Sequence, residues 1–170
     1  MIAVGYAAVL VIVDEKRRIV MGRKTCNSRY PWGCDAAFPG GRVAPGETVV
    51  ETALREAQEE VCLEPTRVAI VGVLEPVSPR NVNDLQVYPV LAKAVRPLQL
   101  KICSEELDRL AYLPIEELCR WKLVMWRHPL RGIRVEALKV DDEVYVWGMS
   151  LRVLERIKEW LCKRVREGTF

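Results

Sequence analysis

A chain of 170 residues is long enough to form one hydrophobic core, and its contents of 50% hydrophobic and 29% charged residues are typical of a globular protein. We therefore expect a single domain over residues 1–170. The formal net charge of +3 is too small to indicate a nucleic-acid-binding protein, although it is compatible with an anionic small-molecule substrate.

The first apolar run, Ile2–Val13, stops at Asp14, is too short to span a bilayer and has no basic leader before it. We interpret it as a buried strand, joined by the polar turn 14–17 to a second strand at Arg18–Arg23 in a hairpin. Residues 24–36 form a polar loop that leads into a short strand at Phe38. We expect a cytoplasmic protein that makes no use of a membrane.

An amphipathic helix is predicted to begin near Thr48, because Thr48 and Glu51 have the spacing of a capping box. At about 100° per residue, Glu56, Glu59 and Glu60 lie on one face of this helix, beside an apolar stripe. Glu56 and Glu60 repel each other, and no basic residue lies between them on that face. We expect Mg2+ or Mn2+ to offset this repulsion, because both ions prefer oxygen ligands.

The segment before this helix favours a binding site over a merely solvated acidic face. The run Pro39-Gly40-Gly41 can let the backbone approach a ligand closely, and the Pro45-Gly46 turn delivers Glu47 to the helix start. Glu47 could pair with Arg55 and so hold the loop against the helix. An acidic face without these neighbours would more often be only solvated.

Further strands are predicted at Arg67–Leu74 and Leu85–Val95. Pro89 in the second of these favours an edge strand or a bulge, because proline cannot donate to a sheet ladder. Beyond them, Ser104–Leu110 and Pro114–Cys119 are predicted to form helical turns.

The C-terminal part is predicted to contain a hairpin, Gly132–Val140 with Glu143–Trp147, followed by a helix at Ser150–Arg166. Apolar residues recur in this helix at intervals of three and four, so we expect it to pack against the core. A mixed sheet that carries one loop and helix and is closed by a C-terminal helix indicates an α/β or α+β sandwich.

The six cysteines show neither a CxxC pair nor another spacing typical of metal ligands, so we expect no zinc site. Without a secretory leader they are predicted to be reduced. The composition is, however, poor in Asn and Gln and prefers Arg to Lys, a trait of heat-adapted proteins, in which intracellular disulfides occur. Whether any pair is oxidised stays open at this stage.

The stretch Phe38–Leu63 resembles the Nudix box. The positions that match it are Gly41, Glu47, Arg55, Glu56, Glu59, Glu60 and Leu63. Ala57 stands in for an aliphatic residue, and Cys62 replaces the usual glycine at the helix end, where glycine eases a left-handed conformation. The resemblance implies an α/β/α sandwich with a mixed central sheet. It also implies metal-dependent hydrolysis of the diphosphate linkage in a nucleoside diphosphate joined to another group.

The same resemblance implies roles for individual residues. Glu56 and Glu60 would be direct metal ligands, Glu59 a further ligand or the general base, and the Gly40 carbonyl another oxygen donor. The other box residues, Gly41, Glu47 and Arg55, would be structural. Two carboxylates from a later segment, Glu105 and Glu106, are the alternative for the general base, unless they are only solvated acids at a helix start.

Segments outside the box resemble the coenzyme A diphosphatase branch; they are 19–23, 29–41, 87–90 and 146–150. The motif of that branch has one residue fewer between its two arginines and one fewer between its glycine and FPGG. We carry over Arg23 and Arg29 as candidate phosphate contacts, since a guanidinium group can donate two parallel hydrogen bonds. A surface salt bridge is the alternative for both.

The box predicts the reaction but not the leaving group, so other substrates remain open. A nucleoside triphosphate or ADP-ribose hydrolase is one alternative, and a module that senses a nucleotide without cleaving it is another. Tyr30 and Trp32 could stack on an adenine, although we favour a packing role for Trp32. His128, the only histidine, receives no catalytic role. The resemblance also allows a homodimer.

Overall fold

The computed structural model describes residues 4–80 and 82–170, so the start of the predicted strand Ile2–Val13 lies outside the described residues. The chain divides into two compact units, and each unit combines two separate stretches. The first unit contains Met1–Lys16 and Phe38–Ser104, and the second contains Arg17–Ala37 and Glu105–Phe170. No helix within the described ranges is long and apolar enough to cross a membrane.

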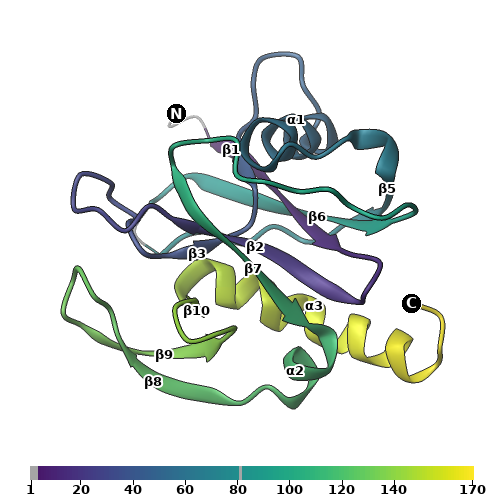
Figure 1. Ribbon diagram of the computed structural model, residues 1–170. Coiled ribbons are helices and arrows are strands. Elements are labelled where there is room, and N and C mark those ends of the chain that lie inside the picture. The colour runs from purple at the N-terminus through teal and green to yellow at the C-terminus, as the bar shows by residue number, and fades with distance from the viewer. Residues whose placement is uncertain (1–3, 81) are drawn as a thin grey trace. The chain divides into compact units, whose positions relative to one another are not determined.

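A mixed sheet forms the first unit together with one long helix (Figure 1). Its strands are β1 (Gly5–Val13), β4 (Gly40–Arg42), β5 (Val68–Val73) and β6 (Leu85–Ala94). Strand β1 pairs with β6 in parallel and with β4 in antiparallel, whereas β5 pairs with β6 in antiparallel. Because β1 has a partner on both sides, its residues from position 7 onward are buried as a continuous apolar run.

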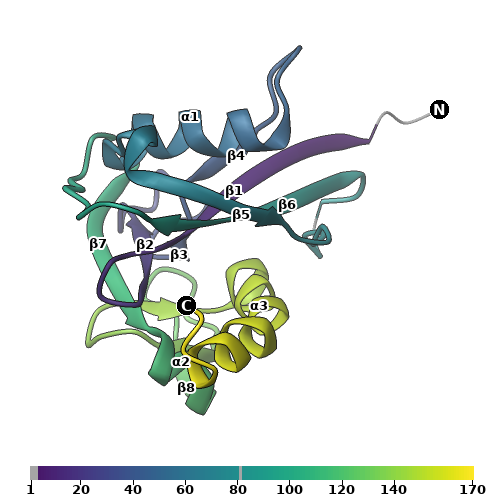
Figure 2. The same cartoon turned by 90° about the vertical axis from the view of Figure 1, so that its right-hand side faces the viewer.

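Helix α1 (Val49–Val61) packs on β1, and Figure 2 shows it lying along one face of the sheet of the first unit. The predicted capping box is present, since Thr48 Oγ1 accepts from the Glu51 N–H at 3.2 Å and Glu51 Oε2 accepts from the Thr48 N–H at 2.8 Å. The helix ends at Cys62 and is followed by a short 3-10 turn, η1 (Pro65–Arg67). The predicted start near Thr48 is therefore confirmed.

The expectation that Pro89 marks an edge strand is wrong. Strand β6 lies between β1 and β5, and Pro89 is paired with Val9 of β1. The Pro89 carbonyl accepts from the Leu74 N–H at 2.9 Å, one residue beyond the end of β5 at Val73, so the missing Pro89 donor falls where the β5 ladder ends. The irregularity in this ladder lies in β5 instead, between Ile70 and Gly72.

In the second unit, β2 (Arg18–Lys24) pairs in antiparallel with β3 (Ala36–Ala37) on one side and with β7 (Leu107–Pro114) on the other. The helical turn predicted at Ser104–Leu110 is therefore wrong. Buried and more exposed side chains alternate along part of β7, which is the pattern of a strand with one covered face, and β2 pairs with it over its length. The pairing partner, distant in sequence, decides the conformation.

The rest of the second unit contains a second sheet and two helices. The sheet has the order β10-β9-β8, and the predicted hairpin corresponds to β9 (Arg134–Lys139) and β10 (Tyr145–Val146). Strand β8 (Leu123–Arg127) was not predicted. Helix α2 (Ile115–Arg120) packs against α3 (Gly148–Arg166). The predicted mixed α/β fold with a mixed sheet is confirmed.

The six cysteines form three disulfides, so the prediction that they are reduced is wrong. The pairs are Cys26–Cys34, Cys62–Cys103 and Cys119–Cys162, with Cα atoms 4.3, 5.9 and 5.7 Å apart. Two of these pairs are separated by 41 and 43 residues in the sequence. Sequence spacing alone says nothing about such distances, because only the fold brings the Cα atoms within bonding range.

Candidate active site

An ion pair fastens the loop before α1 to the helix. The Arg55 side chain donates from Nε to Glu47 Oε1 at 2.7 Å and from Nη2 to Glu47 Oε2 at 3.1 Å. Glu47 Oε2 also accepts from the Thr52 hydroxyl at 2.7 Å and from the Ala44 N–H at 3.3 Å. The structure thus contains the predicted Glu47–Arg55 pair, and its forked geometry fixes both side chains.

These contacts lower the pKa of Glu47 from 4.5 to about 2, and the hydrogen bond from Arg55 is the largest cause, followed by the one from Thr52. The same pairing raises the pKa of Arg55 above its usual value. Glu47 is therefore a carboxylate at every pH at which the protein would work, and it serves to hold Arg55 rather than to exchange protons.

The guanidinium of Arg55 also reaches the acidic face of α1. Its Nη1 lies 3.0 Å from Glu56 Oε1 and 3.4 Å from Glu59 Oε1. The expectation that no basic residue relieves the repulsion on this face is therefore wrong for Glu56. A long arginine side chain can bend across the helix surface, so its position in the sequence does not reveal which acids it neutralises.

Two carboxylates of α1 lie against the paired glycines of β4. Glu60 is 5% exposed, and its Oε2 accepts from the Gly40 N–H at 3.2 Å. A Cβ atom added to Gly41 would stand 2.6 Å from the carboxyl carbon of Glu56. A side chain at position 41 would therefore displace the Glu56 carboxylate from its present position, and the Gly40-Gly41 segment and α1 together form a cradle of carboxylate and backbone groups.

This donor set fits a hard divalent cation. Mg2+ is usually bound by one or two carboxylates, while waters and substrate phosphates complete its coordination. In the parts of the chain that the structure describes, no three acidic, histidine or cysteine side chains gather closely enough to form a metal-binding group by themselves. Glu56 and Glu60 are the carboxylates that could supply the protein's oxygens, and the Gly40 carbonyl stays a predicted donor.

The two candidate phosphate contacts belong to the second unit and differ in their surroundings. Arg23 donates from Nε to Asp108 Oδ1 at 2.7 Å and from Nη1 to the Glu143 carbonyl at 3.4 Å. Arg29 is exposed, and in the described residues its guanidinium makes no hydrogen bond or ion pair; only its backbone N–H is bonded, to Asn27 Oδ1 at 3.0 Å. Arg29 thus presents a free cation, whereas Arg23 is held.

The alternative base candidates also lie in the second unit. Glu105 is exposed, and its backbone carbonyl accepts from the Thr25 hydroxyl at 2.6 Å. Glu106 lies 3.6 Å from Lys24 Nζ. Both residues precede β7 rather than open a helix, so the solvated helix-start interpretation does not apply to them.

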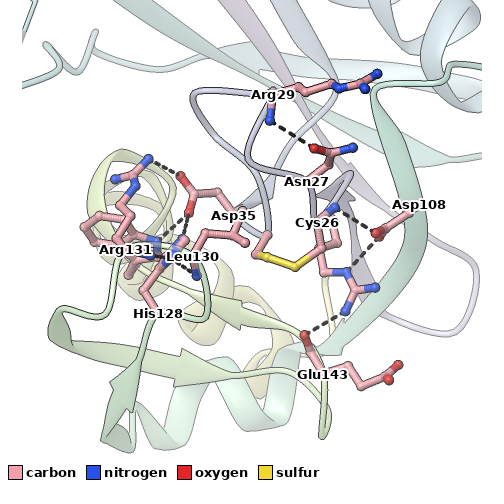
Figure 3. Close-up of a disulfide and its surroundings, with 12 residues drawn as sticks. Cys26, Asn27, Arg29, Asp35, Asp108, His128, Leu130, Arg131 and Glu143 are labelled. Carbon is pink, nitrogen blue, oxygen red and sulfur yellow. Dashed lines mark hydrogen bonds and ion pairs between the residues drawn. A yellow bond between two sulfur atoms is a disulfide. The ribbon is translucent and has the colours of Figure 1, made fainter.

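Sequence reasoning missed two acids that organise the loop between β2 and β3. Asp108 accepts from the Cys26 N–H at 3.0 Å in addition to Arg23, as Figure 3 shows. Asp35 accepts from Trp147 Nε1 at 2.9 Å, and its Oδ1 lies 2.9 Å from Nε2 of the fully buried His128. No signal in the sequence pointed to Asp108, which lies beside Arg109 at the start of β7, in a segment predicted to be a helical turn.

The lone histidine has a structural role. His128 Nδ1 accepts from the backbone N–H groups of Leu130 and Arg131, at 3.2 and 3.1 Å, so its Nε2 carries the proton that is donated to Asp35. The favoured packing role for Trp32 is wrong, because this side chain is 54% exposed. Trp32 lies on the loop closed by Cys26 and Cys34.

Comparison with known proteins identifies the family. A family model described as the NUDIX domain matches residues 4–132. The chain belongs to the Nudix hydrolase family. It is 31% identical to a protein of Pectobacterium atrosepticum named "Uncharacterized Nudix hydrolase NudL", over 89% of this chain and 80% of that protein. A NudL protein of Escherichia coli O6:H1 matches with the same identity and coverage.

Solved structures agree with this assignment. The Nudix hydrolase RenU from M. smegmatis is similar with a TM-score of 0.65 over 96% of this chain and 89% of its own, at 14% identity, which shows the fold alone. An Ap4A hydrolase from C. elegans is similar with a TM-score of 0.54 and 25% identity, over 65% of this chain and 80% of its own. Nudix hydrolases cleave diphosphate linkages in nucleotide derivatives and generally use divalent metal ions.

Proposed function

We propose that this Nudix hydrolase, as a single domain over residues 1–170, cleaves the diphosphate linkage of coenzyme A or a related nucleotide conjugate with Mg2+ or Mn2+. The observation that carries the proposal is the placement of the Glu56 and Glu60 carboxylates against Gly40 and Gly41. Hard oxygen donors beside closely packed backbone suit a cation that also binds a phosphate. When bound, such a cation neutralises phosphate oxygens and lowers the pKa of an attacking water.

The surroundings of the three acids indicate different roles for them. Glu60 is buried and held by the Gly40 N–H, and Glu56 is oriented by Arg55, so both are suited to a fixed role as ligands. Glu59 is 58% exposed and only loosely paired with Arg55 at 3.4 Å, which leaves its carboxylate open to water. We assign Glu59 as the general base on this ground.

The choice of coenzyme A rests on the segments outside the box that resemble the coenzyme A diphosphatase branch. The free guanidinium of Arg29 supports a phosphate contact there, while Arg23 would have to exchange or share its bond with Asp108. A cytoplasmic location belongs to the same proposal. Three disulfides are compatible with it because intracellular proteins of heat-adapted organisms carry them.

A substrate panel tests the assignment. Coenzyme A, ADP-ribose, a diadenosine polyphosphate and nucleoside triphosphates would each be incubated with the protein and Mg2+ or Mn2+, and the products quantified. We expect coenzyme A to give the highest kcat/KM. Rapid cleavage of another member of the panel without cleavage of coenzyme A would reject this substrate but leave the Nudix reaction intact.

Substitution of the box acids tests their roles. We predict that Glu56→Gln and Glu60→Gln each lower kcat by about 100-fold or more, because each would remove a charged ligand of the cation that stabilises the reacting phosphate. Glu51→Gln is the matched control on the same helix, since glutamine preserves a capping box and the rate should stay near that of the wild type. Near-normal rates in both active-site variants would refute the assignment.

A further inference from the structure

The last turn of α1 carries Glu60 and is contacted by a segment that has no helix or strand of its own. This segment follows β6 and consists of residues 97–103, which we call the strap. The Cys103 N–H donates to the Glu60 carbonyl at 2.9 Å, and the Lys101 N–H donates to the Val61 carbonyl at 3.2 Å. Carbonyls of a last helical turn have no partner within the helix, so the strap satisfies two of them.

The strap is anchored at both ends within the first unit. At its start, the Pro97 carbonyl accepts from Arg67 Nη1 at 2.8 Å. At its end, the disulfide Cys62–Cys103 joins it to the residue that caps α1. Residues 101–103 are exposed. Burial therefore contributes little at this end, and the covalent bond is what ties the two N–H donors to the helix.

Glu60 connects the strap to the candidate metal site. Its carbonyl accepts from the strap, while its side chain, 5% exposed, accepts from the Gly40 N–H at 3.2 Å. Movement of the last turn of α1 would therefore carry this carboxylate away from β4. Helix ends fray, and α1 has no basic residue in its last turn that could stabilise the carbonyls there. The strap supplies the donors instead.

We propose that Cys62 and Cys103 are positioning residues, whose disulfide keeps the strap on the last turn of α1 and so holds the Glu60 carboxylate at the Gly40 N–H. The proposal rests on the proposed function, in which that carboxylate binds the cation. A ligand that is already in place does not have to be ordered when the metal binds. The disulfide thus raises the affinity for the cation through Glu60, without touching the cation.

Binding of Mn2+ to a variant without this disulfide tests the positioning role. We expect Cys62→Ser with Cys103→Ser to raise the Kd for Mn2+, measured by calorimetry on folded protein, by about tenfold, because loss of a group that orients a metal ligand typically has an effect of this size. Only the Mn2+ binding that Glu60→Gln abolishes is counted.

The matched control is Cys119→Ser with Cys162→Ser. This disulfide spans a similar separation, 43 rather than 41 residues, but joins α2 to α3 in the second unit. The control should lose a similar amount of stability, because loop closure depends on the length of the loop. It should nevertheless bind Mn2+ with the Kd of the wild type.

Hydrogen exchange of the Gly40 amide tests the same positioning without any metal. This N–H is bonded to Glu60 Oε2, so its exchange rate reports whether the carboxylate stays in place. Relative to amides in the centre of β1, exchange at Gly40 should be several-fold faster in the variant without the Cys62–Cys103 bond than in the wild type. It should be unchanged in the control variant.

The outcomes separate the positioning role from the proposed function. A wild type that binds no Mn2+ through Glu60, but whose exchange at Gly40 depends on the Cys62–Cys103 bond, would overturn the proposed function and support the positioning of Glu60. Binding of Mn2+ with an unchanged Kd in the variant without this bond would overturn the positioning role alone. An equal rise of Kd in both double variants would also overturn it, because the effect would then follow stability rather than the strap.

Discussion

Arg55 shows how one side chain can serve both the fold and the site. It closes the loop through Glu47 and at the same time lies 3.0 Å from a carboxylate oxygen of Glu56. Part of the negative charge on α1 is thus balanced by the protein before any cation binds.

The lowered pKa of Glu47 predicts a pH-dependent contribution to stability. A carboxylate whose pKa is lower in the folded chain than in the unfolded chain stabilises the fold above the unfolded value, here 4.5, and this contribution is lost as the pH falls through about 2. We predict that Glu47→Gln is less stable than the wild type at pH 7. The difference in the urea midpoint should shrink between about pH 4.5 and pH 2.

The control for this prediction is Glu64→Gln, which removes the pair with Arg67 at the more exposed carboxylate of Glu64. Surface pairs of this kind contribute little, so its effect at pH 7 should be smaller. A difference between wild type and Glu47→Gln that stays constant over the acidic range would show that the ion pair is not its source.

At the scale of elements, the end of α1 explains why cysteine can replace the glycine of the box. Cys62 has φ 54° and ψ 36°, the left-handed conformation that costs a residue with a side chain about 1–2 kcal/mol. The disulfide to Cys103 and the bond from the Cys103 N–H to the Glu60 carbonyl, at 2.9 Å, hold this turn in place. The helix that carries the acids is therefore tied at its end to the segment after β6.

The effect of Cys62→Gly should reverse with redox conditions. In reductant, where no disulfide exists, the free energy of unfolding of the glycine variant should be about 1 kcal/mol higher than that of the wild type, because glycine adopts φ > 0 without strain. Without reductant it should be less stable, since closing a loop with a separation of 41 residues contributes about 4 kcal/mol. Urea unfolding with and without dithiothreitol measures both differences.

Cys62→Ser is the comparison variant, because it removes the disulfide but keeps a side chain at the left-handed position. It should be less stable than the glycine variant in both conditions. A glycine variant that matches the wild type without reductant would mean that the Cys62–Cys103 bond contributes nothing to the fold.

For the whole molecule, the three disulfides are predicted to supply a large part of the stability. Loop closure contributes about 4 kcal/mol for each of the two long separations, 41 and 43 residues, and about 2.5 kcal/mol for the separation of eight. Their sum is comparable to the whole net stability of an ordinary domain, about 5–15 kcal/mol. Complete reduction, verified by counting free thiols, should therefore lower the urea midpoint strongly.

Two double variants measure how much individual disulfides contribute to this stability. Cys119→Ser with Cys162→Ser removes the bond between α2 and α3 and should cost more than Cys26→Ser with Cys34→Ser, which opens only the short loop. A fully reduced protein with an unchanged midpoint would contradict the prediction.

Much of the first unit could be predicted because its signals are local. The capping box at Thr48, the acidic face of α1 and the Glu47–Arg55 pair follow from helix geometry and short separations in the sequence. The strand at Leu85–Ala94 and the C-terminal helix were likewise indicated by apolar runs and periodicity. These are the features in which a residue's neighbours along the chain decide its environment.

By itself, then, the sequence determined the family, the reaction that the family catalyses and the helix that presents Glu56 and Glu60, because box residues act at fixed spacings along one element. Only the tertiary structure decided which cysteines pair, that β7 is a strand, that Arg55 reaches Glu56, and that Trp32 is exposed on a loop supported by Asp35. Each of these depends on distances between segments far apart in the chain or on how a long side chain bends, and neither is encoded in the spacing of residues.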